Sequence, residues 1–84
     1  MNNLIQEYIF RVLGKVSGII RTDVDVVMIT PCNGSDSDDV FKNFEDMMVN
    51  FGYGYISRKG DGNIYLHFNS KELADSFGFA YAHK

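Results

Sequence analysis

The sequence is poor in the residues that mark several protein classes. Its 84 residues contain one proline, no tryptophan and one cysteine, Cys32. A single cysteine excludes an internal disulfide framework, and no stretch resembles a secretory signal peptide or a membrane span of about 20 apolar residues. We therefore expect a protein of a reducing, cytoplasmic compartment.

Positive charge is also scarce. Eight Lys and Arg residues against eleven Asp and Glu residues give a net charge of -3. This argues against a protein that holds duplex nucleic acid by bulk charge, because that mode needs many cations. Arg58 and Lys59 lie beside a predicted turn, and the acids concentrate elsewhere, which predicts a surface with one acidic edge. The acids of that stretch are Asp36, Asp38, Asp39, Glu45 and Asp46.

The hydrophobic content is that of a compact globular domain. Hydrophobic residues make up 45% of the chain, so we expect residues 1–84 to form one domain. Apolar residues recur at steps of three and four near the N-terminus, which predicts an amphipathic helix over residues 2–15. Residues 15–22 fit either a strand hairpinned onto the next strand or a frayed end of the helix, and we favour helix followed by loop.

The next segment, Val24 to Thr30, is rich in β-branched residues and predicts a strand. Apolar residues occupy both of its alternating sets, which is typical of a strand that is covered on both faces. We therefore expect the N-terminal helix to lie on the second face of the sheet.

A helix is predicted after this strand. Ser35, Asp36 and Ser37 are all competent N-caps, and an apolar stripe at helical spacing runs from Asp38 to Phe51. Gly52 is placed to end this helix.

The C-terminal part predicts a hairpin and a last helix. Tyr53–Arg58 and Asn63–Phe68 alternate with a period of two around Gly60-Asp61-Gly62, and Ser70 can cap a helix that follows. The fold class is therefore α+β, an N-terminal helix followed by a β-α-β-β-α unit over residues 24–83. This is a split βαβ, ferredoxin-like arrangement with a three-stranded, largely antiparallel sheet.

The second hairpin strand carries a resemblance to a known family. Residues 61–68 resemble the octapeptide of the RNA recognition motif, and residues 68–75 resemble the strand-to-helix junction that follows it in that family. Asp61 stands where the family prefers a basic residue, and Asn63 where it prefers an aromatic one. The matching residues are Gly62, Tyr65, Leu66 and Phe68.

The resemblance covers about residues 24–80. It implies a ferredoxin-like sheet, with Tyr65 as the residue that stacks on a base and His67 beside it. Single-stranded RNA binding through Tyr55, Tyr65 and His67, helped by the cations Arg58 and Lys59, is therefore the alternative function.

A small interaction protein is the leading hypothesis for function. No motif specifies a reaction, a cofactor or a metal site, so we do not expect an enzyme. Compact acidic chains of this kind are common among phage-encoded inhibitors of host enzymes or defence systems, which predicts a protein partner. Open sheet edges would also permit a homo-oligomer.

Two groups of residues are predicted to contact that partner. Tyrosines are enriched at binding hot spots, and three of them fall on the predicted hairpin strands. The turn aspartates would imitate phosphates if the partner is a nucleic-acid-processing enzyme. The predicted partner-binding residues are Tyr53, Tyr55, Arg58, Lys59, Tyr65, His67, Asp36, Asp38 and Asp39.

Overall fold

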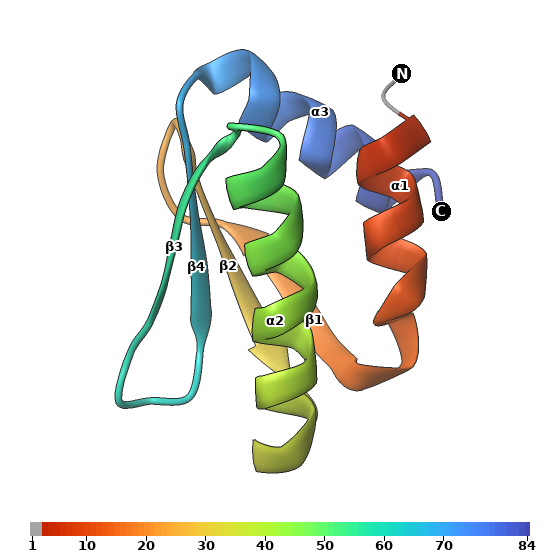
Figure 1. The fold of residues 1–84 in the computed structure, drawn as a ribbon, viewed down its shortest axis with the longest axis vertical. Helices are drawn as coiled ribbons and strands as arrows, with labels where there is room; N and C mark the ends of the chain where they lie inside the picture. The colour runs from red at the N-terminus through yellow and green to blue at the C-terminus, as the bar shows by residue number, and fades with distance from the viewer. Residues whose placement is uncertain (1–2) are drawn as a thin grey trace.

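The computed structural model describes residues 3–84 and has an α+β architecture with three helices and one antiparallel sheet of four strands (Figure 1). A 3-10 turn, η1, joins the first helix to the first strand. The elements in chain order are α1 (Asn3–Arg11), η1 (Leu13–Lys15), β1 (Val16–Arg21), β2 (Val26–Pro31), α2 (Gly34–Asn50), β3 (Gly54–Arg58), β4 (Ile64–Phe68) and α3 (Lys71–Ala82).

The sheet has one strand more than the sequence predicts. The expected loop over residues 15–22 is wrong, because β1 pairs antiparallel with β2. A register shift between Val16 and Gly18 interrupts the regular alternation of β1, so its periodicity is weak. The predicted helix over residues 2–15 is shorter, since α1 ends at Arg11, and residue 2 lies outside the described residues.

The strand order is β1-β2-β4-β3, and all neighbours are antiparallel. β2 and β3 are therefore parallel to each other, with β4 between them and α2 as their connection. The predicted strand, helix, strand, strand, helix order is present in the second part of the chain. β1 adds a fourth strand on the outer side of β2.

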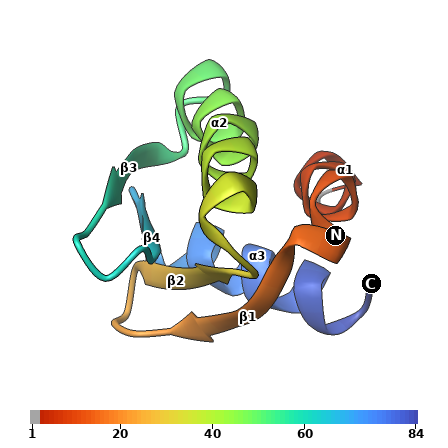
Figure 2. The same ribbon diagram turned by 90° about the horizontal axis from the view of Figure 1, so that it is seen from below.

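The hydrophobic core lies on one face of this sheet. Phe44 of α2 and Phe77 of α3 meet edge to face at 5.6 Å, and Phe77 also lies 5.7 Å from Phe68 of β4. Figures 1 and 2 show α2 against this face with α1 beside it. The strand residues buried in the core are Val27, Ile29, Ile64, Leu66 and Phe68.

The position of α1 corrects a prediction. Ile5, Tyr8 and Ile9 are buried in the same core as α2 and α3, so α1 does not cover the second face of the sheet. The apolar stripe of α1 finds its partners between the other two helices. Val26 and Met28, which suggested a strand covered on both faces, are only half-buried.

Side-chain caps begin α2 and α3, one at the predicted residue and one at another. Ser70 caps α3 as predicted, accepting a hydrogen bond from the Leu73 N–H at 3.2 Å. α2 is capped by Asn33 instead of the three predicted residues, and begins at Gly34. The Asn33 Oδ1 accepts from the Asp36 N–H at 2.9 Å and from the Ser35 hydroxyl at 2.8 Å, so an asparagine outcompetes the later candidates.

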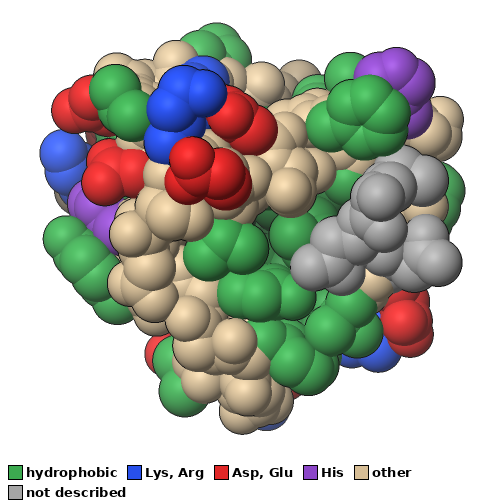
Figure 3. Space-filling view, turned by 90° about the horizontal axis from the view of Figure 1, so that it is seen from above, with side chains coloured by type: hydrophobic (Ala, Val, Ile, Leu, Met, Phe, Trp, Pro, Cys, Tyr) green, Lys and Arg blue, Asp and Glu red, His purple; other side chains and the backbone are tan. Residues whose placement is uncertain are grey.

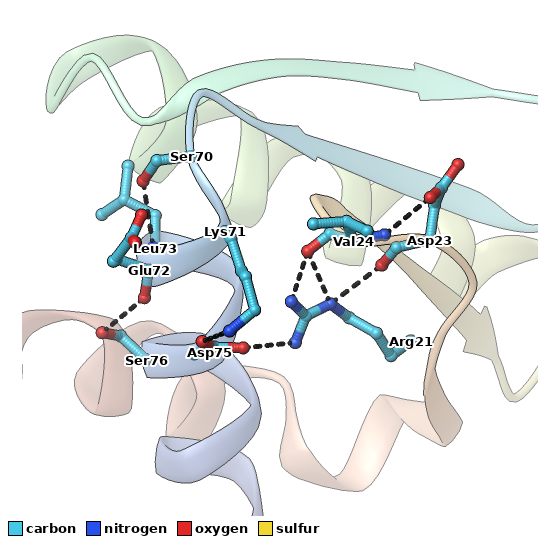
Figure 4. A network of polar contacts seen from close by, with 9 residues as sticks. All are labelled: Arg21, Asp23, Val24, Ser70, Lys71, Glu72, Leu73, Asp75 and Ser76. Atoms are coloured by element: carbon cyan, nitrogen blue, oxygen red, sulfur yellow. Dashed lines mark hydrogen bonds and ion pairs between the residues drawn. The ribbon is translucent and has the colours of Figure 1, made fainter.

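The Arg21 side chain ties the β1–β2 hairpin to α3 (Figure 4). Its Nε donates to the carbonyl oxygens of Asp23 and Val24 at 2.9 and 3.1 Å, and its Nη1 lies 3.0 Å from the Asp75 Oδ1. Lys71 contacts the other carboxylate oxygen of Asp75 at 2.8 Å. The hydrogen bonds from Lys71 and then from Arg21 lower the pKa of Asp75.

Gly54 leaves no room for a side chain between β3 and β4. Its φ is +149°, and a Cβ placed there would lie 1.9 Å from the carbonyl oxygen of His67. We predict that Gly54→Ala destabilises the protein by about 3 kcal/mol or more, since backbone strain and overpacking add. Urea unfolding measures the change. Gly18→Ala is the control, because its Cβ would meet open space; equal stability of the two variants would contradict this geometry.

The Asp75 network predicts a pH dependence of stability. A carboxyl whose folded pKa is lowered stabilises the fold above its unfolded pKa of about 4, and this stability disappears as pH falls through the folded pKa. Asp75→Asn should therefore melt below the wild type at pH 7, and the two melting temperatures should converge in acid. Thermal melts by circular dichroism between about pH 2 and pH 7, a range that spans these pKa values, test this. A constant difference at every pH would contradict it.

Candidate binding face on the open side of the sheet

The sheet face opposite the helices carries a cluster of aromatic and apolar side chains. Cross-strand register aligns Ser57, Tyr65, Met28 and Ile20 in one row across all four strands. The side chains on this face are half-buried or exposed, and Tyr55 and Ile20 are 63% and 57% exposed. We call this surface the open face, and its members are Ile20, Val26, Met28, Tyr55, Ser57, Tyr65 and His67.

Contacts between neighbouring strands hold the aromatic part of the open face in place. The rings of Tyr55 and His67 stack with centroids 4.2 Å apart and an interplanar angle of 4°. A hydrogen bond of 2.9 Å joins the Ser57 hydroxyl to the His67 Nε2. Lys59 places its ammonium 4.5 Å from the centroid of the Tyr65 ring, a cation–π geometry. The cluster is therefore ordered before any ligand arrives.

Four of the predicted site residues, Tyr55, Lys59, Tyr65 and His67, meet at the open face. Tyr53 does not join them. Tyr53 packs against the core and lies 5.9 Å from Phe51, which in turn meets Tyr8 edge to face at 6.1 Å. The unusual φ of Gly54 breaks the alternation between Tyr53 and Tyr55. Figure 3 views the molecule from above Figure 1 and shows hydrophobic side chains gathered in the middle of that face.

Arg58 also lies away from the open face. Its Nη1 contacts the Asp38 Oδ1 at 2.7 Å, and its guanidinium carbon lies 4.5 Å from the centroid of Phe41. Because Arg58 pairs with Ile64, it shares the helix side of the sheet. Arg58 and Lys59, the two cations expected to help bind single-stranded RNA, therefore lie on different sides of the sheet.

The acidic turn is not the purely acidic edge that the sequence predicts. Asp38 pairs with Arg58, and Asp39 lies 2.8 Å from the ammonium of Lys15. The hydrogen bond to Asp39, together with its charge, raises the pKa of Lys15. Acidic and basic residues that are separate in the sequence are neighbours in the structure, because η1 and the β3–β4 hairpin bring Lys15 and Arg58 to the start of α2. The aspartates stay largely exposed, so a basic partner can still reach them.

An open pocket of about 410 Å³, lined mainly by polar residues, lies between the end of β2, the start of α2 and the β3–β4 turn. Its charged groups already have partners within the chain, since Arg58 binds Asp38 and the Asp61 carboxylate accepts from the N–H and side-chain amide of Asn63. Within the described part of the chain, no three side chains of His, Cys, Asp or Glu lie close enough to hold a metal ion. The open face is the better candidate for binding.

The Ser57–His67 contact has the spacing of a nucleophile and its base. Such a pair needs a third group to orient the imidazole, and among residues 3–84 we find no hydrogen bond to the His67 Nδ1. Stacking on Tyr55 orients the ring instead. Sequence reasoning missed Ser57, although counting back from the hairpin turn would have placed it on the same face as His67.

Comparisons with known proteins leave the family open. A scan against protein-family models, a search of curated proteins and a search of solved structures each returned no match. A test for membrane-crossing helices was also negative for residues 3–84, because none of these helices combines the required length and apolar character.

Proposed function

We propose that this chain is a small non-catalytic interaction protein that binds a larger macromolecular partner through the open face and thereby inhibits or regulates it. One observation carries the proposal. The sheet exposes an ordered aromatic cluster on the side that all three helices leave free. An exposed apolar surface of this kind marks interaction sites in soluble domains.

The energetics of the open face suit a binding hot spot. Tyrosine offers a large contact area at a low entropy cost, and the stacking on His67 already restricts Tyr55. Met28 and Ile20 extend the surface with apolar area next to Tyr65. A partner that covers these residues would gain hydrophobic burial without first having to order them.

A protein partner fits the charge of the chain better than a nucleic acid. The net charge is -3, and Lys59 is the cation placed over the open face. Exposed ion pairs contribute only about 0–1 kcal/mol, so a basic partner could replace Arg58 and Lys15 at the turn aspartates. A nucleic-acid-processing enzyme presents such a basic groove, which agrees with a phage-type inhibitor of a host enzyme or defence system.

Capture of partners from a host lysate tests the proposal. We predict that the double variant Tyr55→Ala, Tyr65→Ala loses at least about tenfold in capture, because each hot-spot tyrosine is worth roughly 2 kcal/mol or more. The control is the variant Phe10→Ala, Phe79→Ala, whose two rings are about half exposed on the helices. Quantitative mass spectrometry of nuclease-treated lysates gives the readout.

A charge-reversal variant distinguishes binding through the turn aspartates from binding through the open face. The triple variant Asp36→Lys, Asp38→Lys, Asp39→Lys should weaken capture if the partner uses a basic groove, and should leave capture unchanged if the open face acts alone. Full capture by the tyrosine variant would refute binding through the open face. Circular dichroism of each variant checks that the fold is retained.

Single-stranded RNA is the second candidate ligand. The stacked Tyr55–His67 pair and the Lys59–Tyr65 contact favour it, since bases stack on such rings for about 1–3 kcal/mol each. The element order β2-α2-β3-β4-α3 supports a ferredoxin-like arrangement for residues 24–83. The RNA recognition motif has a sheet of this type. The scarcity of cations on the open face limits the expected affinity.

A titration with a mixed-sequence single-stranded RNA pool decides between the two ligands. If RNA is the ligand, fluorescence anisotropy should show saturable binding at low salt that Tyr65→Ala weakens about tenfold. Binding should also fall as salt rises, because phosphate contacts release counterions. No binding at low salt would remove this candidate and leave the protein partner.

A further inference from the structure

β1 is an edge strand with its outer side unpaired among residues 3–84. The Thr22 N–H donates to the Val26 carbonyl at 3.0 Å. Because bonded and non-bonded pairs alternate in an antiparallel ladder, Ile20 and Met28 form the next hydrogen-bonded pair. Ile19 and Arg21 therefore direct their backbone N–H and C=O groups outward, where another strand could bind them.

The register shift between Val16 and Gly18 is the one irregularity of this edge, and the stretch from Gly18 to Arg21 pairs regularly with β2. Natural edges carry charged side chains, prolines or covering elements, yet residues 16–20 are Val-Ser-Gly-Ile-Ile. Arg21 is the one charged residue of β1, and its side chain folds back onto Val24 and Asp75 (Figure 4). The opposite edge, β3, ends in the charged Arg58 and is contacted by α2.

We propose that β1 pairs antiparallel with β1 of a second copy of this chain, with the two-fold axis at Ile20. In this register Ile19 lies opposite Arg21 of the other copy, so the outward backbone groups of both strands are satisfied. Ile20 lies opposite Ile20 of the other copy. The two four-stranded sheets then form one continuous sheet.

Side chains and charge favour a second copy over another partner. Ile20 is 57% exposed and neighbours Met28, so the axis joins the apolar rows of two open faces end to end. No acidic residue lies opposite another acidic residue in this register. A basic protein would bind acidic residues, and a nucleic acid would bind cationic residues. The stretch from Val16 to Ile20 contains neither kind.

The size of the contact sets the expected affinity. Pairing over a few residues at a strand edge buries less than the 1,200 Å² or so that stable interfaces reach. The dimer should therefore dissociate on dilution into the micromolar range. This association does not depend on the proposed partner, because Tyr55 and Tyr65 lie on the strands farther from β1.

Sedimentation equilibrium over a concentration series tests the dimer. The wild type should rise from the 9.5 kDa of one chain towards twice that mass. Ile20→Lys should remain monomeric at all concentrations, because it places two like charges opposite each other at the axis. Val49→Lys is the matched control, since Val49 is 64% exposed on α2, away from the β1 edge, and should leave association unchanged.

A charge-complementation experiment tests the register. Ile20→Lys and Ile20→Glu should each be monomeric alone, and an equimolar mixture should recover the dimer mass. Circular dichroism confirms that each variant is folded. A wild type that stays monomeric into the millimolar range, or a mixture that fails to recover dimers, would overturn the proposal. The Tyr55→Ala, Tyr65→Ala variant should still form the dimer. Dimer formation and partner capture can therefore fail independently of each other.

Discussion

All three helices bury the same face of the sheet, and this shared contact holds the domain together. Phe44 and Phe77 meet edge to face above Phe68, so α2, α3 and β4 share one packing contact. α1 completes the same core with Ile5 and Ile9. A domain of 84 residues has few apolar side chains with which to build a core. Because every helix packs on one face of the sheet, the other face has no covering layer.

The uncovered face remains stable because its residues tolerate partial exposure. Tyrosine, histidine and methionine combine apolar area with polar or adaptable groups, and cross-strand contacts shield part of each ring. Tyr55 stacks on His67, and Lys59 covers Tyr65. The same features make the open face suitable for a partner, since its side chains are ordered while much of their area still faces water.

Ion pairs connect the elements around the sheet without creating an anion-binding surface. Lys15 and Arg58 reach the first turn of α2, while Arg21 reaches Asp75 of α3. These cations are then turned away from the open face and away from the β1 edge. Both remain low in charge, which agrees with a protein partner on the face and a second copy at the edge.

The local features of this protein can be predicted from short stretches of its sequence. The apolar stripes of α2 and α3, the Ser70 cap and the hairpin around Gly60–Gly62 follow from interactions within a few residues, and the structure confirms them. Tertiary structure decided that residues 16–21 are a strand, that α1 joins α2, and that Arg58 and Tyr53 leave the open face. Sequence periodicity shows which side of a helix or strand is apolar. It does not show which element packs on that side, which strand pairs with an edge or which residue a long side chain contacts, because these depend on residues far away in the chain.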